Sequence, residues 1–412
     1  MFVKLQSFIL GRMRLRGAKG RKAVDGKKLG YLESIRGLAA CAVVFAHIIA
    51  AYLPGVAQQQ AGDLVTNPLA GRLFYGLPLG FMASGHFAVV LFFVLSGFVL
   101  TYKFFSSNNQ QDLHRQAAKR FFRLAIPIFA IVMVAYVMVA NGAMGYTDRV
   151  VELTNSPEAA RNYHFTPTLN DALHAASVGV FTERDIKLNP VLWTMPIEFF
   201  GSFIVLGLAA FIGKVRHRWI VYTGAIVLLG DSYYVCFILG MMLADVVQRT
   251  KFVNFVHEKV SRVYFAVALA IVLVIASFPL PSNGLEGTIF ESLLIANVDT
   301  LYAFKIWQYF GAILLLTVIV TSPLLQRVLN NKILVILGGL SFAIYLTHYL
   351  ILYSAGHYAY VLSRGTYGVS LSAIIAGSVT VVITLGVAVL WKKYIDDMSV
   401  RVSRAFASYI LK

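Results

Sequence analysis

Residues 31–50 read YLESIRGLAACAVVFAHIIA, an almost wholly apolar run that is long enough to cross a lipid bilayer as a single helix. The run nevertheless carries Arg36 near its start and His47 in its middle, both ionisable. Ionisable groups are costly inside a bilayer, so they usually serve a function there. The stretch therefore predicts a membrane fold and, within that fold, a polar site.

The composition of the whole chain supports this interpretation. The 412 residues are 58% hydrophobic and only 13% charged, and the mean hydropathy is +0.72. A soluble domain carries about 25% charged residues. One soluble core could not hide this much apolar surface, so the composition argues against a large soluble protein with buried helices.

Ten apolar segments are candidates for membrane spans. Because a helix satisfies its own backbone hydrogen bonds in lipid, we predict an all-α fold, a polytopic membrane helical bundle of about ten transmembrane helices. The segments are 35–53, 86–104, 121–140, 190–212, 216–230, 233–248, 263–279, 303–322, 333–355 and 369–391.

The net charge of +17 is concentrated in short basic blocks between the apolar segments. Basic loops alternate with neutral or acidic ones, which predicts ten spans with both termini in the cytoplasm. The same distribution argues against a nucleic acid as the partner. We expect a basic cytoplasmic tail at 1–30, a membrane domain at 31–395 and a short cytoplasmic tail at 396–412. Whether the first tail is an amphipathic helix on the inner leaflet or a disordered segment stays open.

Arg36 and His47 share one face of the first span. Eleven residues at about 100° each end roughly 20° beyond three full turns, which places the two side chains about 16 Å apart along the helix axis. Arg36 is expected at the cytoplasmic edge, where Glu33, one turn earlier, can pair with it. His47 is too short and too deep to reach the bilayer surface, so it needs a polar partner or a water-filled cavity.

A carboxylate is expected near His47. The segment NPVLWTMPIEFFGSF, residues 189–203, places Glu198 at a depth that overlaps that of His47. A carboxylate next to an imidazole can orient the ring and raise its basicity. The alternative, a structural Glu198 paired with another span, stays open.

Two further segments carry ionisable groups. In KRFFRLAIP, residues 119–127, Arg120 and Arg123 lie one turn apart and could form a cationic rim with Arg36 and Lys119 that suits phosphates. Ordinary positive-inside charge is the alternative. In LSFAIYLTHYLILY, residues 340–353, His348 follows Tyr345 by one turn, and both a catalytic and a structural role are open for His348.

A deep histidine, a carboxylate and an inner arginine rim favour general-base catalysis on a donor that bears phosphates. An acyl thioester of coenzyme A is such a donor. Its phosphates would bind the arginines, and its long pantetheine arm would carry the acyl group toward His47. His47 could then activate a hydroxyl acceptor as a general base.

Five phrases of the sequence together resemble the acyltransferase-3 family of integral-membrane O-acyltransferases. They are LESIRGLAACAVVFAH with Glu33, Arg36 and His47; FFVLSGF at 92–98; RFFRLAIP; the Trp193, Thr194 and Glu198 element; and Tyr345 with His348. The resemblance covers nearly the whole chain in order. It implies transfer of an acyl group, often acetyl, from acyl-CoA as co-substrate to a hydroxyl of a carbohydrate or glycoconjugate, with no permanently bound cofactor.

The resemblance also implies roles for individual residues of the membrane acyltransferase domain, 31–395. The implied catalytic residues are His47, Glu198 and His348, the donor-binding residues are Arg36, Arg120 and Arg123, and the supporting residues are Glu33, Trp193 and Tyr345, with no metal site. Tyr349 stands where many members have proline soon after the late histidine. The family's commonest use implies a bacterial inner membrane, while a fungal or animal membrane stays open.

Two other classes of function remain as alternatives. Spans with buried His, Glu and Arg also form proton-coupled transport sites, so a carrier for an acyl group or a modified sugar is the second interpretation. Clear inverted repeats, which are common in carriers, are not found in the sequence. A scaffold for a glycan-assembly complex would leave His47 without a role.

Overall fold

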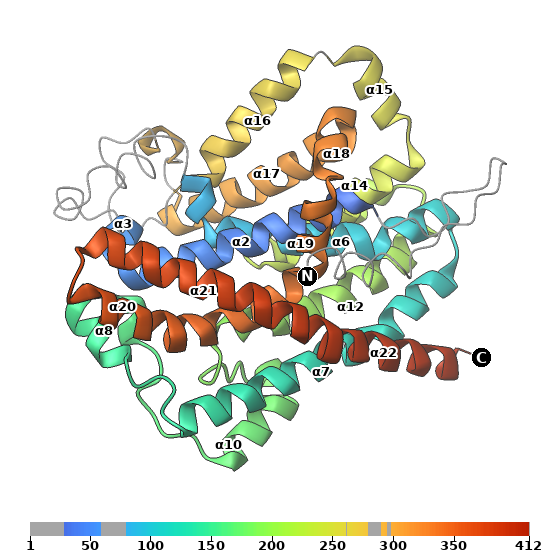
Figure 1. The fold of residues 1–412 in the computed structure, drawn as a ribbon. Helices are drawn as coiled ribbons and strands as arrows, with labels where there is room; N and C mark the ends of the chain where they lie inside the picture. Colours follow the sequence, from blue (N-terminus) through green and yellow to red (C-terminus); the bar gives the residue numbers. More distant parts are fainter. Residues whose placement is uncertain (1–28, 59–79, 261, 279–289, 295–297, 412) are drawn as a thin grey trace.

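The computed structural model describes residues 29–58, 80–260, 262–278, 290–294 and 298–411 (Figure 1). Within these ranges every regular element is a helix, which confirms the all-α prediction. The predicted N-terminal tail lies almost entirely outside the described residues. So do most of the loop after the first span and part of the acidic loop before residue 302, and the predictions about these segments stay predictions.

Seven helical segments are long and apolar enough to cross a membrane, judged by length and composition. Four of them are single helices and three contain a short turn of different pitch. They are α2 (Gly30–Tyr52), α6 (Gly85–Ser107), α7 (Gln110–Ala140), a 3-10 turn at Pro190–Trp193 with α12 (Thr194–Ile212), α17 (Thr300–Thr321), α19 (Lys332–Ile351) with α20 (His357–Arg364), and α21 (Val369–Trp391) with α22 (Asp397–Ile410).

The other three expected spans are also helical, but they are shorter than the ~20 residues that a bilayer requires. They are α13 (Arg218–Leu229), α14 (Tyr234–Arg249) and α16 (Arg262–Ala276), with 12, 16 and 15 residues. The count of ten spans and the cytoplasmic location of both termini therefore stay predictions. The remaining α-helices are α3 (Pro54–Gln58), α8 (Thr147–Thr154), α9 (Pro157–Ala160), α10 (Leu169–His174), α11 (Val180–Thr182), α15 (Phe252–Lys259) and α18 (Pro323–Leu329).

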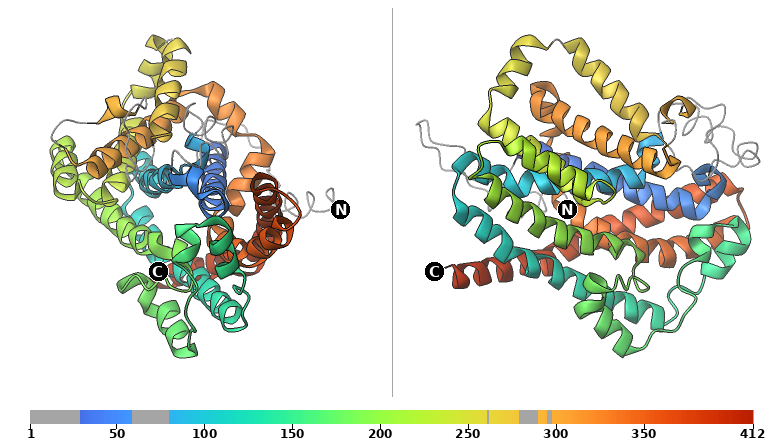
Figure 2. Two further views of the ribbon diagram at one scale, coloured as in Figure 1. Left: turned by 90° about the vertical axis from the view of Figure 1, so that its left-hand side faces the viewer. Right: turned by 180° about the vertical axis from the view of Figure 1, so that it is seen from behind.

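The helices α2 and α6 form the centre of the bundle. An end-on view shows them enclosed by the other long helices (Figure 2, left). α19 packs along α2, and α14 packs along α6. The residues that decided the fold prediction therefore lie on the central helix, whose side chains can meet several neighbours at once.

Glycines let α2 and α19 touch backbone to backbone. A Cβ atom on Gly37 would lie 2.6 Å from the amide nitrogen of Gly338, and one on Gly338 would collide with the carbonyl of Glu33. The two helices run in the same direction, and each carries a histidine ten residues after its glycine. This close contact therefore brings His47 and His348 together about 15 Å further along the bundle.

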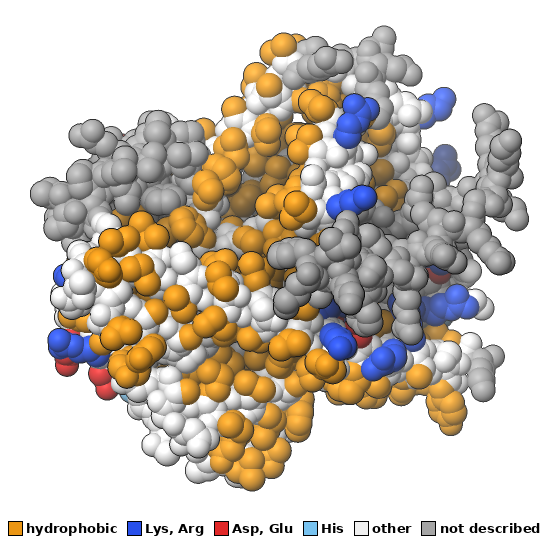
Figure 3. Space-filling view, in the orientation of Figure 1, with side chains coloured by type: hydrophobic (Ala, Val, Ile, Leu, Met, Phe, Trp, Pro, Cys, Tyr) orange, Lys and Arg blue, Asp and Glu red, His pale blue; other side chains and the backbone are white. Residues whose placement is uncertain are grey.

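The two ends of the bundle differ in charge. The end where α6 finishes at Ser107 and α7 begins at Gln110 we call the basic end, because Lys and Arg gather there on the face seen in Figure 3. The end where α2 finishes at Tyr52 and α20 begins at His357 we call the far end. Hydrophobic side chains cover much of the surface between them, as lipid contact requires.

The predicted C-terminal tail is largely helical. A π-helical turn, Lys392–Asp396, joins α21 to α22, and α22 packs along α7. α22 extends away from the bundle at the basic end (Figure 1).

Candidate active site

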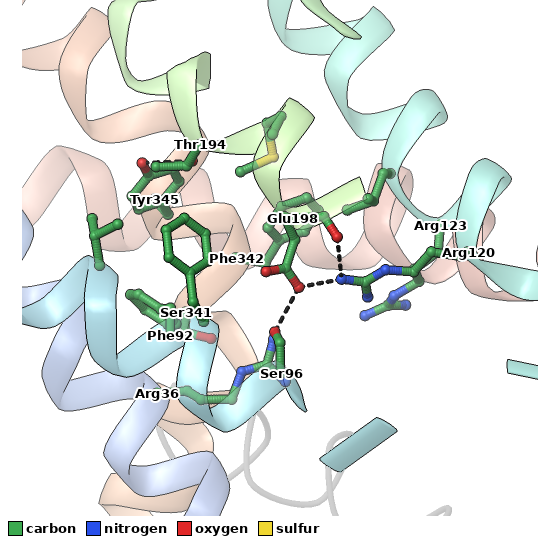
Figure 4. Close-up of a pocket in the computed structure, with 14 residues that line it drawn as sticks. Arg36, Phe92, Ser96, Arg120, Arg123, Thr194, Glu198, Ser341, Phe342 and Tyr345 are labelled. Carbon is green, nitrogen blue, oxygen red and sulfur yellow. Dashed lines mark hydrogen bonds and ion pairs between the residues drawn. The ribbon is translucent and has the colours of Figure 1, made fainter. Parts of the chain in front are cut away.

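A pocket lies among α2, α6, α7, α12 and α19, and Figure 4 shows its lining. We call it the cationic pocket because three arginines line it. Its lining residues are Arg36, Val89, Phe92, Phe93, Ser96, Arg120, Arg123, Leu124, Thr194, Met195, Glu198, Ser341, Phe342 and Tyr345. The structure thus confirms the expectation that Arg36, Arg120 and Arg123 lie together, while Lys119, expected in the same rim, is not among the lining residues.

Glu198 belongs to this pocket and not to the surroundings of His47. Its carboxylate forms an ion pair with Arg120 and accepts a hydrogen bond of 2.6 Å from the Ser96 hydroxyl (Figure 4). The Arg120 and Glu198 side chains are only 14% and 15% exposed. The predicted contact between Glu198 and His47 is therefore wrong. Glu198 instead pairs with a residue of another span, as in the alternative that the sequence left open.

The other two arginines of the pocket differ from each other. Arg123 Nη2 lies 3.3 Å from Asp396 Oδ1. Arg36 forms none of the ion pairs found among the described residues, and the expected pair between Glu33 and Arg36 is absent from that set. Arg36 is half-buried. Its guanidinium is therefore the one in this pocket without a described carboxylate partner, which suits it to bind an anionic ligand.

Tyr345 both lines the pocket and lies next to His348. Its hydroxyl donates to the Val191 carbonyl at 2.9 Å and shares a hydrogen bond of 2.9 Å with the Thr194 hydroxyl. The centroid of its ring lies 6.0 Å from that of His348. Trp193, an expected supporting residue, is not among the lining residues and instead packs its ring 5.5 Å from Tyr233.

Beyond Tyr345 lies a second group, His47, Glu158, His348 and Tyr349, which we call the histidine cluster. The ring centroids of His47 and His348 are 5.4 Å apart, and His47 Nδ1 lies 3.4 Å from Glu158 Oε1. The Tyr349 hydroxyl donates to the same Glu158 oxygen at 2.8 Å. The His47 and Glu158 side chains are 28% and 27% exposed.

His348 is fully buried and leaves one ring nitrogen available. Its Nδ1 lies 3.0 and 2.8 Å from the carbonyl oxygens of Ile344 and Tyr345. A carbonyl only accepts, so these contacts assign the proton to Nδ1 and leave a lone pair on Nε2. Nε2 has no hydrogen-bond partner in the described structure. Since a buried polar atom without a partner is costly, this nitrogen is suited to a donor from a substrate.

Sequence reasoning missed Glu158, which comes from the loop region after α7. It sits in α9, a short helix with Ser156 as its N-cap and Pro157 in its first turn. The Ser156 hydroxyl also donates to the Ala50 carbonyl at 2.7 Å, which ties α9 to α2 three residues from His47. The sequence Ser156-Pro157-Glu158 is typical of the start of a helix. It does not indicate that this helix packs against α2.

The electrostatics of Glu158 favour its ionised form. Burial raises the pKa of Glu158, but the hydrogen bond and the charge of His47, the Tyr349 hydroxyl and the nearby Arg161 together lower it by more. The net result is a pKa below the ordinary value, so Glu158 is a carboxylate at neutral pH. An ionised Glu158 can orient the His47 ring.

A second pocket opens at the far end, next to the histidine cluster. Its lining residues are Arg161–Pro167, Asp171, Asp185–Leu188 and Pro190. Asn162 belongs to both regions, because its side-chain amide donates to the Tyr349 hydroxyl at 2.9 Å. The ring of Tyr163 lies 5.0 Å from that of Tyr353. We call this pocket the far pocket.

Comparison with known proteins assigns the chain to a family. A family described as "Acyltransferase domain", acyltransferase-3, matches residues 29–391. The chain belongs to the acyltransferase-3 family. No solved structure matches it.

Three relatives from fungi are named as acyltransferases. Acyltransferase R4 of a Phoma species is 26% identical over 71% of this chain and 71% of its own length. Acyltransferase clz18 of Cochliobolus lunatus is 22% identical over 81% and 85%, and O-acetyltransferase PaAT-1 of Phomopsis amygdali is 23% identical over 91% and 83%. The predicted family and the prediction of an acyltransferase enzyme in a membrane are thus confirmed.

In this acyltransferase the sequence segments on which the family resemblance was based contact one another in the structure. Ser96 of FFVLSGF binds Glu198 of the Trp-Thr element, and Thr194 of the same element binds Tyr345. The first and last phrases meet through the His47 and His348 rings. A further ion pair lies outside these two groups: Asp245 binds Arg218 at 2.8 Å and joins α13 to α14.

Proposed function

We propose that this acyltransferase moves an acyl group, acetyl in the simplest case, from acyl-CoA to a hydroxyl group of a second substrate. The observation that carries the proposal is the order of groups along α2 and α19. Arginines line a pocket at one level, Tyr345 lies at its end, and His348 and His47 follow. A donor with phosphates at one end and a thioester at the other fits that order.

The cationic pocket is the proposed donor site. Phosphates of coenzyme A are recognised well by guanidinium groups, which offer two parallel donors. Arg36 supplies the cation without a described counter-ion, and Arg120 and Arg123 add charge beside it. The apolar lining, Phe92, Phe93 and Phe342 among it, suits the pantetheine arm, which carries few charges.

His47 is the proposed general base, and Glu158 positions it. With Glu158 at Nδ1, the other ring nitrogen of His47 is free to take the proton of the acceptor hydroxyl. The hydroxyl oxygen then bonds to the thioester carbonyl carbon, and the carbon–sulfur bond breaks. The proton on His47 passes to the leaving thiolate, so that an ester and coenzyme A are the products. The Nε2 lone pair of His348 accepts a hydrogen bond from the bound acceptor.

The far pocket is the proposed route for the acceptor. It contacts the histidine cluster through Asn162 and lies at the opposite end of the bundle from the basic end. Aromatic and amide side chains next to ionised groups suit a carbohydrate or a glycosylated molecule. The name of PaAT-1, an O-acetyltransferase, supports an acetyl group and a hydroxyl acceptor. The relatives are fungal, so the bacterial inner membrane stays a prediction.

Donor turnover by the purified protein tests this function. The protein in lipid nanodiscs is given labelled acetyl-CoA and a panel of hydroxyl acceptors, and coenzyme A release and ester formation are measured. We expect His47→Ala to bind coenzyme A normally but to lose about 10³-fold in turnover. Arg36→Ala should keep its kcat and raise the donor KM by about tenfold, the loss of one charge-assisted contact.

Two matched variants control for general damage. His114→Ala removes an exposed histidine at the basic end, and Arg327→Ala removes an exposed arginine that does not line the cationic pocket. Both should behave as the wild type. A wild type that binds no coenzyme A, or a His47→Ala variant with normal turnover, would contradict the proposed function.

A further inference from the structure

Asp396 lies at the junction of α21 and α22, outside the region that matches the family, which ends at residue 391. Its side chain is only 3% exposed. A buried carboxylate needs a partner of opposite charge, because the loss of hydration is otherwise too costly. Asp396 has two such partners: Oδ1 lies 3.3 Å from Arg123 Nη2, and Oδ2 accepts a hydrogen bond of 2.8 Å from Lys392 Nζ.

The charges of this region form one network. Lys392 binds both Asp396 and the exposed Asp397, each at 2.8 Å. Two carboxylates share one ammonium group, so a net negative charge is left to act on Arg123. Arg123 lines the cationic pocket with Arg36 and Arg120, and like charges in one pocket repel. A counter-ion behind Arg123 opposes that repulsion and keeps its guanidinium in the pocket wall.

The contact between Asp396 and Arg123 does not use up the guanidinium. Asp396 Oδ1 accepts no hydrogen bond from any described residue, so the contact is an ion pair at 3.3 Å and not a two-pronged hydrogen bond. The Arg123 side chain is 35% exposed. Arg123 therefore keeps N–H donors for a ligand while Asp396 fixes its position.

Helix α22 holds Asp396 in this place. The buried residues of α22 are Ser399, Ser403 and Ala407, spaced four apart on one face, and the helix packs along α7, which carries Arg123. The ring of Phe406 lies 4.8 Å from that of Phe122, the neighbour of Arg123 in sequence. The position of Asp396 is thus coupled to the docking of the whole C-terminal helix on α7.

We propose that Asp396 is a positioning residue for the donor site: through its ion pair with Arg123, helix α22 sets the affinity of the cationic pocket for the phosphates of acyl-CoA. The inference rests on the proposed function, since it takes coenzyme A to be the ligand of that pocket. It adds a segment beyond the matched family region to the donor site. It assigns to that segment an effect on donor affinity and none on the acyl-transfer step.

A double-mutant cycle tests the inference. Binding of coenzyme A and steady-state kinetics are measured for the full-length wild type, Asp396→Asn, Arg123→Gln and the double variant. We expect Asp396→Asn to raise the coenzyme A Kd and the donor KM by about fivefold to tenfold with kcat unchanged. In the Arg123→Gln background the same substitution should have no further effect, because its target is gone.

Two further variants separate positioning from folding. Asp397→Asn removes the adjacent, exposed carboxylate, which binds Lys392 and has no described contact with Arg123, and it should bind coenzyme A as the wild type does. Asp396→Glu should restore most of the lost affinity. An Asp396→Asn variant with normal affinity overturns the inference, as does equal loss in both backgrounds or a fall in kcat alone. A wild type that binds no coenzyme A overturns the proposed function and the inference together.

Discussion

The cationic pocket and the histidine cluster share the helices α2 and α19, but they are built in different ways. The pocket is lined by five helices, and two of its three arginines are matched by carboxylates, Glu198 and Asp396. The cluster joins two histidines from α2 and α19 to one carboxylate, Glu158, from a short helix in a loop region. One region is arranged to hold charge, and the other to hold and move a proton.

This difference separates binding from chemistry along one pair of helices. Substitutions in the pocket should change the donor KM, and substitutions in the cluster should change kcat. Tyr345 lies between the two regions, in the pocket lining and 6.0 Å from the His348 ring.

After His47, the largest effect is expected at His348. Replacement by Phe keeps a ring in the buried site but removes the Nε2 lone pair, so a substrate hydrogen bond is lost and kcat should fall by about 10²-fold. Turnover at saturating donor measures it. His357→Phe is the matched control, because His357 is equally buried, also has an unpartnered Nε2 and lies nine residues further along. Equal losses in both variants would mean that His348 is only structural.

Glu158→Gln should lower kcat by about tenfold, since residues that orient a catalytic ring typically contribute 10- to 100-fold. Donor KM should not change. Tyr349→Phe removes one of the hydrogen bonds to Glu158 and should have a smaller effect. A Glu158→Gln variant with full kcat would show that His47 needs no carboxylate partner.

Glu158 also gives a pH dependence of stability. Its pKa in the folded state is lower than the ordinary value of 4.5, so its stabilising contribution is complete above that pH and is lost as the pH falls through the lowered pKa. The wild type should therefore unfold at a higher temperature than Glu158→Gln at pH 7. The difference should shrink below about pH 4. Thermal unfolding in nanodiscs across this range measures it, and a constant difference would contradict the ionised state.

Much of the fold and of the pocket could be predicted from the sequence, because both depend on local spacing. The apolar runs predicted helices, and the eleven-residue spacing placed Arg36 and His47 on one face of α2. The grouping of Arg36 with Arg120 and Arg123 followed from their shared level at span ends. His348 could be related to Tyr345 by one helical turn.

The rest depended on contacts between segments that are distant in the sequence. Depth along a span placed Glu198 level with His47, but Glu198 lies at the level of the arginines, in the cationic pocket, and pairs with Arg120. Glu158 lies in a segment of mixed charge with no apolar run to fix its depth. Its approach to His47 depends on the Ser156 contact with α2, which no local pattern encodes. Asp396 was placed in a tail because it follows the last apolar run.

A moderate effect is expected at Glu198. It tests whether this residue acts with the cationic pocket, in donor binding, or with the histidine cluster, in catalysis. Glu198→Gln removes the charge opposite Arg120 but keeps an acceptor for Ser96. Because Arg120 would lose its fixed position, the donor KM should change by about fivefold to tenfold while kcat stays near that of the wild type. Initial rates at varied acetyl-CoA measure both. A fall in kcat with unchanged KM would return Glu198 to the catalytic group.

The smallest effect is expected at Tyr345, at the boundary of the two regions. Tyr345→Phe keeps the ring beside His348 but removes the hydroxyl that bonds the Val191 carbonyl and the Thr194 hydroxyl. The loss of such a neutral hydrogen bond costs about 1 kcal/mol, so kcat and the donor KM should each change by about fivefold or less. Thr194→Val, which removes the partner hydroxyl at equal size, is the matched control. If Tyr345→Phe lowers kcat by about as much as His348→Phe while Thr194→Val does not, the Tyr345 hydroxyl takes part in the reaction, and the boundary between donor binding and chemistry lies within the cationic pocket.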